Sequence, residues 1–258
     1  MVSAMRAHLL QLDLAWEDHE ANYRLVEDAL DNAKPDPGDF VLLPELFDTG
    51  FSFRTETNAD KEGRTLEFLL TLADDLGVTI QGGRTLRPCD CDKAFNAATV
   101  VAPDEKVLCE YRKIHPFTFG REPEFFTGGS EVLTYTWNTL TVCPAICYDL
   151  RFPELFRVGL RKGAQLFALG ANWPSPRQHH WRALAIARAI ENQAFVLAVN
   201  RTGSDPHLKY SGGSIAIGPK GEILGELDEK PGTLSVEIDP QSLHDWRATF
   251  PAWRDVRL

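Results

Sequence analysis

The 258-residue sequence has no long apolar run, no internal repeat and no low-complexity segment. No stretch approaches the roughly 18 consecutive apolar residues of a membrane-spanning helix, so we expect no association with a membrane. Near the N-terminus, the acidic Asp13 comes before any apolar region like that of a secretion signal. These absences predict a cytoplasmic protein. No stretch rich in glycine and serine divides the chain, and its length suits one hydrophobic core, so we expect a single domain over residues 1–258.

Acidic residues outnumber basic residues in this chain. It has 27 lysines and arginines against 37 aspartates and glutamates, which gives a formal net charge of −10. A protein that binds nucleic acid must neutralise phosphates with a basic surface, and this composition can supply one only as a local patch. We therefore expect no nucleic-acid partner.

The five cysteines indicate neither a disulfide framework nor a metal site. An odd number without a secretion signal leaves at least one thiol unpaired. Cys89 and Cys91 have C-x-C spacing, and no second pair of ligands stands nearby, so we expect no metal there. Cys109 and Cys143 lie inside apolar stretches and are typical of core residues.

Cys147 has a different setting from the other cysteines. It lies where an apolar, strand-like stretch meets the segment 152–155 (Phe-Pro-Glu-Leu), which is typical of a helix start. Backbone N–H groups and the helix dipole at such a junction would favour a thiolate. On its own, a free cysteine is more often a buried core residue.

Two charged residues occupy places like that of Cys147. Glu45 follows the apolar stretch 40–44, and Lys113 follows the stretch 107–112. Sites in α/β sheets are built at strand ends, so these side chains would converge if their strands are neighbours. Glu45 could then take the thiol proton, while Lys113 and the backbone N–H of Tyr148 stabilise an oxyanion. Taken singly, either charged residue could simply face water.

The apolar patterns predict about twelve strands and four helices. Strand and helix alternate in the first and third quarters, whereas the second quarter and the end give strand after strand with tight turns. This mixture indicates large mixed sheets covered by helices. The expected helices are 18–33, 65–76, 153–161 and 177–192. The expected strands are 6–14, 40–43, 78–81, 97–102, 107–114, 132–137, 139–146, 165–169, 194–200, 214–217, 223–227 and 233–238.

Three segments carry a resemblance to a known family. The segments 42–47 (Leu-Leu-Pro-Glu-Leu-Phe), 111–117 (Tyr-Arg-Lys-Ile-His-Pro-Phe) and 146–155 (Ile-Cys-Tyr-Asp-Leu-Arg-Phe-Pro-Glu-Leu) resemble the three catalytic motifs of the nitrilase superfamily, the carbon-nitrogen hydrolases, in that family's order. Later segments extend the resemblance over nearly the whole chain and are most similar to the bacterial omega-amidase (2-oxoglutaramate amidase) branch. Members of that branch hydrolyse the terminal amide of dicarboxylate monoamides. The later segments are 171–174, 180–181, 187–193, 200–205 and 250–253.

The resemblance implies a role for each candidate residue. Glu45 would be the general base, Lys113 the oxyanion stabiliser and Cys147 a nucleophile that forms a thioester, without a cofactor. A second glutamate is expected before an aromatic-x-x-Gly segment, where Glu122 matches and Glu124 is a competitor. The fold implied is α/β, a four-layer α-β-β-α sandwich of two mixed β-sheets flanked by helices. Family members usually form homodimers, so we expect one here.

A small dicarboxylate monoamide would also need a cation to bind its free carboxylate. Arginine is suited to this because its guanidinium binds carboxylates through two hydrogen bonds. Asn172 and Trp173 follow the apolar stretch 165–169, where the wall of a pocket is expected, although plain packing suits Trp173 equally well. The sequence does not choose among four arginines: Arg54, Arg151, Arg177 and Arg201.

Other functions remain open at this point. The same catalytic residues could act on deaminated glutathione, an N-carbamoyl amine or a nitrile, and the segment 147–155 also resembles the deaminated-glutathione amidases. A non-catalytic binding protein on the same fold is the third alternative, against which the intact set of Glu45, Lys113 and Cys147 speaks. Arg188 and Glu191, three residues apart in a predicted helix, are expected to form an ion pair.

Overall fold

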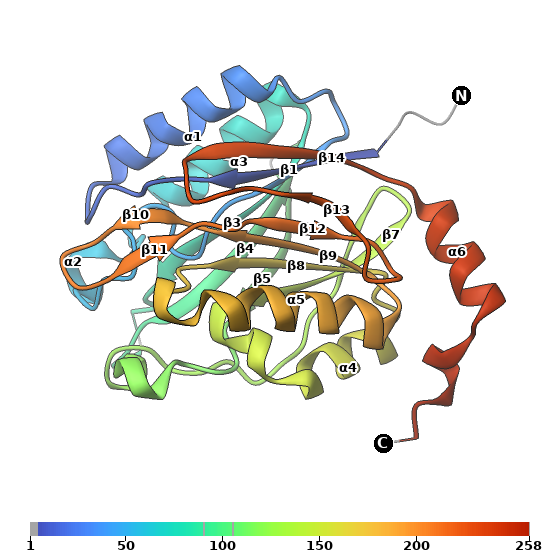
Figure 1. The fold of residues 1–258 in the computed structure, drawn as a ribbon. Coiled ribbons are helices and arrows are strands. Elements are labelled where there is room, and N and C mark those ends of the chain that lie inside the picture. The colour runs from blue at the N-terminus through green and yellow to red at the C-terminus, as the bar shows by residue number, and fades with distance from the viewer. Residues whose placement is uncertain (1–4, 90, 105, 258) are drawn as a thin grey trace.

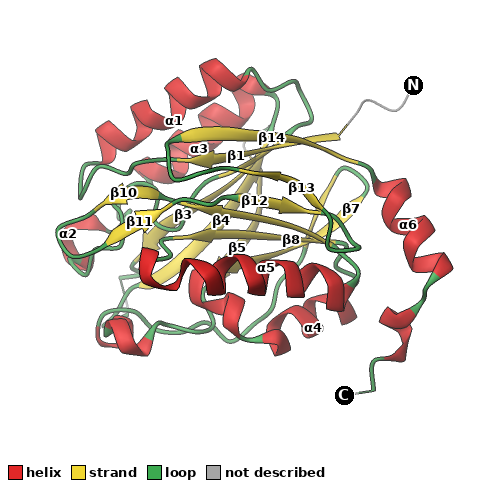
Figure 2. Ribbon diagram, viewed as in Figure 1, coloured by secondary structure: helices red, strands yellow, loops and turns green. Residues whose placement is uncertain are grey.

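The computed structural model describes residues 5–89, 91–104 and 106–257. Two six-stranded β-sheets pack face to face, and helices lie on their outer faces (Figures 1 and 2). The expected four-layer α-β-β-α sandwich is therefore confirmed. Within the described ranges, no helix combines the length and the apolar character needed to cross a membrane.

The first sheet has the strand order β14-β1-β2-β3-β4-β5. β1, β2 and β3 are parallel to one another, whereas β14, β4 and β5 each run antiparallel to the strand beside them. As a result, β5 runs in the same direction as β2. The strands are β1 (Met5–Gln11), β2 (Phe40–Leu42), β3 (Thr79–Leu86), β4 (Phe95–Ala102), β5 (Lys106–Arg112) and β14 (Gly232–Ile238).

The second sheet has the order β13-β12-β9-β8-β7-β6. β7, β8 and β9 form its parallel centre, and antiparallel strands close both edges. A short hairpin of β10 (Thr202–Ser204) and β11 (Lys209–Ser211) forms a separate two-stranded sheet. The strands of the second sheet are β6 (Tyr135–Trp137), β7 (Leu140–Ile146), β8 (Leu166–Ala171), β9 (Phe195–Asn200), β12 (Ile215–Ile217) and β13 (Ile223–Glu226).

Helices cover the two outer faces of the sandwich. α1 and α3 lie together against the first sheet, whereas α4 and α5 lie on the opposite side against the second (Figure 1). α1 begins at its N-cap Asp18, whose side chain accepts a hydrogen bond from the Ala21 N–H. α6 lies beside the sandwich. The helices are α1 (His19–Ala33), α2 (Thr55–Asn58), α3 (Arg64–Leu76), α4 (Pro153–Arg161), α5 (Gln178–Asn192) and α6 (Pro240–Thr249).

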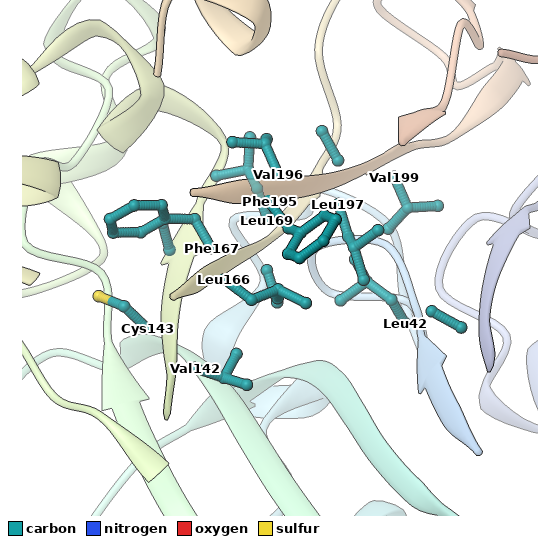
Figure 3. Close-up of a cluster of buried hydrophobic side chains, with 14 of the residues drawn as sticks. Leu42, Val142, Cys143, Leu166, Phe167, Leu169, Phe195, Val196, Leu197 and Val199 are labelled. Carbon is teal, nitrogen blue, oxygen red and sulfur yellow. The ribbon is translucent and has the colours of Figure 1, made fainter. Parts of the chain in front are cut away.

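The continuous apolar strands follow from this layering, because the central strands are covered on both faces. In β2, the side chains of Phe40 and Leu42 enter the core between the sheets, whereas Val41 packs with the residues under α1 and α3. Figure 3 shows Leu42 of the first sheet among side chains of β7, β8 and β9 of the second. The inter-sheet core therefore holds the strand ends of both sheets in fixed positions.

The structure adds short elements that apolar patterns did not predict. β10 and β11 have three residues each and α2 has four, too few to show a period. The first strand ends at Gln11 rather than at residue 14, although Leu12 and Leu14 are buried. The apolar residues of the stretch 6–14 had predicted a longer strand, and the last of them are buried without being part of it.

Candidate active site

The three residues that were predicted to converge lie at the same edge of the sandwich. Glu45 follows β2, Lys113 follows β5 and Cys147 follows β7. β2 and β5 run in the same direction, so their carboxyl ends meet at one edge of the first sheet. The carboxyl ends of β7 and β8 reach this edge from the second sheet. The site is thus built between the two sheets.

Two glycines let the backbone of Glu45 fit between the sheets. A Cβ atom at Gly83 of β3 would lie 2.5 Å from the backbone N of Leu46 and 2.9 Å from the Cα of Glu45. From the other sheet, a Cβ atom at Gly170 of β8 would lie 2.7 Å from the carbonyl oxygen of Leu43. Such distances are too short for any side chain. Glycine at both positions is therefore required for this path of the chain.

A buried cluster of charged groups surrounds Lys113. Its Nζ donates to Glu45 Oε1 at 2.7 Å and to Glu122 Oε2 at 2.9 Å. All three side chains are at most 1% exposed. Burying a charge is costly unless it is paired and hydrogen-bonded, and here one cation lies between two carboxylates.

The environment shifts the proton affinities of this cluster. Burial lowers the pKa of Lys113, but the charges of Glu122 and Glu45 outweigh burial, so that this pKa is raised and the ammonium keeps its charge. Burial raises the pKa of Glu122, while Lys113 opposes this shift without cancelling it. Glu124, the competing glutamate, is exposed and forms an ion pair with Arg121. The structure therefore brings Glu122, and not Glu124, to Lys113.

Asn96, which the sequence patterns did not single out, connects the members of the cluster. This residue of β4 is 1% exposed, and its Nδ2 donates to Glu45 Oε1 at 2.8 Å and to Glu122 Oε1 at 2.9 Å. The backbone carbonyl oxygen of Asn96 also accepts a hydrogen bond from the backbone N–H of Lys113 at 2.8 Å. A polar asparagine within the apolar stretch 94–102 was the signal that could have drawn attention to it.

Cys147 lies in a tight turn directly after β7. Its φ is +45°, in the left-handed region that non-glycine residues rarely adopt. Burial raises the pKa of the Cys147 thiol well above its ordinary range, and the charge of Glu45 raises it further, whereas Lys113 lowers it. A thiol in this setting keeps its proton at neutral pH, so it would need a base before it could act as a nucleophile.

The expected help from a helix dipole is not found at this thiol. A short 3₁₀ turn, Cys147–Arg151, begins at this cysteine, and α4 starts only at Pro153. The effect of a helix terminus falls off within one turn, so α4 does not act on Cys147 directly. The predicted helix 153–161 is confirmed, but its start lies too far along the chain for its dipole to act on the thiol.

A cavity of about 630 Å³ opens onto Cys147, Glu45 and Lys113. Asn172, which follows β8, lines this cavity and also binds Glu45. The backbone N–H of Asn172 donates to Glu45 Oε2 at 2.9 Å, and its side-chain Nδ2 donates to the backbone carbonyl oxygen of Glu45 at 2.6 Å. Trp173 also lines the cavity and is 2% exposed. The backbone N–H of Trp173 donates to Asn200, and its indole N–H donates to the Arg177 carbonyl.

The structure separates the four candidate arginines. Arg54 lines the cavity but is paired with Glu17 at 2.8 Å. Arg201 is fully buried, donates to three backbone carbonyls and Asp13, and does not line the cavity. Arg151 and Arg177 line the cavity, and no acidic partner for either occurs among the described residues.

Both of these arginines lie over aromatic rings, and Arg151 Nη2 also lies 3.2 Å from His180 Nδ1. The Arg151 guanidinium carbon is 4.8 Å from the centre of the Trp173 ring and 5.8 Å from that of Tyr148, and the Arg177 guanidinium carbon lies 5.4 Å from the Phe117 ring. Stacking of this kind orients a guanidinium without neutralising it. The cavity thus presents two available positive charges in a chain of net charge −10.

The other expectations concern residues away from the cavity. Arg188 and Glu191 form the expected ion pair at 2.9 Å, and Cys109 and Cys143 are buried. In the part of the chain that the structure describes, no group of three His, Cys, Asp or Glu side chains is arranged to hold a metal ion.

A family model described as "Carbon-nitrogen hydrolase" matches residues 6–248. The 2-oxoglutaramate amidase of Bacillus subtilis strain 168 is 34% identical over 250 residues, which cover 96% of this chain and 96% of that protein.

Two solved structures are similar over nearly the full length. One is XC1258 from Xanthomonas campestris, described as a CN-hydrolase superfamily protein with an arsenic adduct in the active site. It has a TM-score of 0.92 at 34% sequence identity, and the match covers 100% of this chain and 98% of the XC1258 chain. A mutant amidase from Nesterenkonia sp. AN1, described as showing Michael addition of acrylamide at the active site cysteine, has a TM-score of 0.83 at 26% identity, with 96% and 98% covered.

Proposed function

Because the chain belongs to the carbon-nitrogen hydrolase family, and is therefore a hydrolase of carbon–nitrogen bonds, we propose that it is an amidase acting on a small dicarboxylate monoamide such as 2-oxoglutaramate. The products are the dicarboxylic acid and ammonia. One observation carries the proposal: Glu45, Lys113 and Cys147 line a cavity that also presents two arginines without an acidic partner, and Glu122 is paired with Lys113 beside it.

The reaction begins with attack of the thiol on the amide. Glu45 takes the thiol proton as the Cys147 sulfur bonds to the amide carbon, and the carbonyl oxygen becomes an oxyanion. Lys113 and the backbone N–H of Tyr148 stabilise that oxygen. Because the pKa of Cys147 is raised, proton transfer and attack are coupled, and no free thiolate accumulates.

The tetrahedral intermediate then collapses to a thioester. The carbon–nitrogen bond breaks, and the nitrogen takes the proton held by Glu45 and leaves as ammonia. A water molecule replaces ammonia, and Glu45 takes one proton from it as its oxygen attacks the thioester carbon. Breakage of the carbon–sulfur bond returns that proton to Cys147 and releases the acid. One carboxylate thus serves both half-reactions, and no cofactor is required.

The arginines support a substrate that carries a negative charge. We assign the free carboxylate to Arg151, because this residue shares the turn Cys147–Arg151 with the nucleophile and is held over Trp173. A charge-assisted hydrogen bond to a carboxylate contributes about 1.5–3 kcal/mol, or roughly 10- to 150-fold in affinity. The name of the Bacillus subtilis relative agrees with this substrate class.

A panel of substrates tests the proposal. We expect ammonia release from 2-oxoglutaramate and succinamate, and kcat/KM for succinamate about 10- to 150-fold above that for butyramide, its uncharged counterpart. Arg151→Met should reduce this ratio strongly, whereas Arg54→Met should leave it nearly unchanged because Arg54 is already paired with Glu17. Ammonia is measured directly in each case.

The same panel separates the alternatives. Deaminated glutathione, an N-carbamoyl amine and a nitrile are included, and preferential turnover of any of them would replace the proposed substrate while keeping the catalytic residues. No turnover of any dicarboxylate monoamide would reject the proposal. A non-catalytic protein would turn over none of the compounds.

The pH dependence of activity should report on Asn96. The hydrogen bond from Asn96 lowers the pKa of Glu122, so Asn96→Leu raises that pKa further and keeps Glu122 protonated to higher pH. We expect the acid limb of the kcat/KM profile to move to higher pH, and kcat/KM to fall about 10- to 100-fold. Asn192→Leu is the matched control, since Asn192 is equally buried but bonds to Arg188 within α5. A shared shift in both variants, or none in Asn96→Leu, would contradict this role.

Two further expectations stay predictions. A homodimer agrees with the exposed apolar side chains of Val158 on α4 and Ile190 on α5, which lie on the outer helices of the second sheet. The cytoplasmic location rests on the sequence alone.

A further inference from the structure

The carboxylate of Asp149 is fully buried and makes four hydrogen bonds. Its Oδ1 accepts the backbone N–H of His115 at 3.1 Å and lies 2.8 Å from His115 Nδ1. Its Oδ2 accepts the Tyr111 hydroxyl at 2.7 Å and the backbone N–H of Ile146 at 3.0 Å. Each oxygen of this carboxylate therefore bonds to two donors, which leaves little room for a further one.

These donors flank the two residues assigned to nucleophile and oxyanion stabilisation. Tyr111 lies two residues before Lys113, and His115 lies two residues after it. Ile146 directly precedes Cys147. Because β5 and β7 belong to different sheets, Asp149 links the lysine segment of one sheet to the nucleophile turn of the other.

Cys147, His115 and Asp149 are the residue types of a Cys-His-Asp catalytic triad, but their geometry is not that of a triad. His115 is not among the residues that line the cavity, and its Nδ1 is turned to Asp149. Its ring stacks on Phe152, with centroids 3.8 Å apart and planes 8° apart. Glu45, by contrast, lines the cavity together with the thiol. Asp149 and His115 therefore do not touch the reacting atoms.

We propose that Asp149 is a positioning residue that holds the Cys147 turn against the Lys113 segment, so that the sulfur and the oxyanion stabiliser keep a fixed separation. This inference rests on the proposed function. The left-handed backbone of Cys147 costs roughly 1–2 kcal/mol and persists only where surrounding contacts impose it. The hydrogen bond from Ile146 to Asp149 closes this turn, while those from Tyr111 and His115 fix its place relative to Lys113.

The test compares two buried aspartates. Asp149→Asn keeps the shape of the side chain but places an amide N–H against groups that are themselves donors. We expect the Cys147 turn to shift by about 1 Å as a result, and kcat to fall about 100-fold. KM should change less than about threefold, because the cavity wall is intact. Asp60→Asn is the matched control: Asp60 is also buried and bonds to Arg84 and to the start of α3, away from the cavity. It should lose stability and keep kcat when assayed below its melting temperature.

Tyr111→Phe provides a milder variant in case Asp149→Asn does not fold. It removes one of the four hydrogen bonds, and we expect kcat to fall about three- to tenfold with KM unchanged. A crystal structure of Asp149→Asn should show the Cys147 turn displaced from Lys113. Wild-type kcat in Tyr111→Phe, an unmoved turn in Asp149→Asn, or an equal loss of kcat in Asp60→Asn would each overturn the assignment. If the wild-type enzyme hydrolyses no amide of the panel, the proposed function fails, and the crystal structures still decide whether Asp149 holds the turn.

Discussion

Replacing Cys147 by alanine is expected to lower kcat for ammonia release by about 10⁴-fold or more, because the variant has no atom that can form the thioester. Intact-mass measurement during turnover should detect an acyl adduct on the wild-type protein and none on Cys147→Ala. The variant should still fold, since the change removes a single sulfur atom from a turn that already lines a cavity.

Cys143→Ala is the control for this experiment. Cys143 lies four residues earlier, in β7, is fully buried against Gly159 of α4 and does not line the cavity. Its loss should reduce stability but leave turnover and the acyl adduct intact. Equal turnover by wild type and Cys147→Ala would show that the nucleophile has been assigned to the wrong residue.

Glu45→Gln is expected to lower kcat by about 10³- to 10⁴-fold, within the range for loss of a general base or acid. Glutamine preserves the size of the side chain and can keep part of its hydrogen bonding to Lys113 and Asn172. It cannot take a proton from Cys147 or from water, so both half-reactions should slow. Single-turnover measurements of ammonia and acid release would resolve the two steps.

The exposed Glu124 supplies the control for Glu45. Glu124→Gln removes a carboxylate that pairs with Arg121 at the surface, and it should keep wild-type kcat. Circular dichroism and a thermal melt establish that Glu45→Gln is folded. A folded Glu45→Gln enzyme with more than about a tenth of wild-type kcat would be inconsistent with a general base, whose loss costs at least about 10²-fold.

The sequence predicted those parts of the site that depend on local pattern. Glu45, Lys113 and Cys147 each stand at the end of an apolar stretch, and such stretches form strands whichever sheet they join. The helices α4 and α5 were likewise predicted within one residue of their ends, because their apolar periodicity extends over two or more turns.

The sequence could not predict features that depend on which strands become neighbours. Asn96 acts on Glu45 and Glu122 only because β4 lies beside β5, and Asp149 meets Tyr111 only because the two sheets pack face to face. The choice among the arginines had the same limit, since Arg54 and Glu17 lie far apart in the chain. Contacts over such separations leave no periodic signal.

The placement of charge along the cavity has a consequence for release of the product. At the inner end, Glu45 and Lys113 line the cavity and the buried Glu122 pairs with Lys113 behind them, so two carboxylates accompany one ammonium, while Arg151 and Arg177 supply positive charge elsewhere on the wall. A neutral amide group can occupy the inner end without repulsion. Hydrolysis converts that group into a carboxylate, which the excess negative charge repels. For the proposed reaction, we therefore expect the charge of the site to favour release of the acid product.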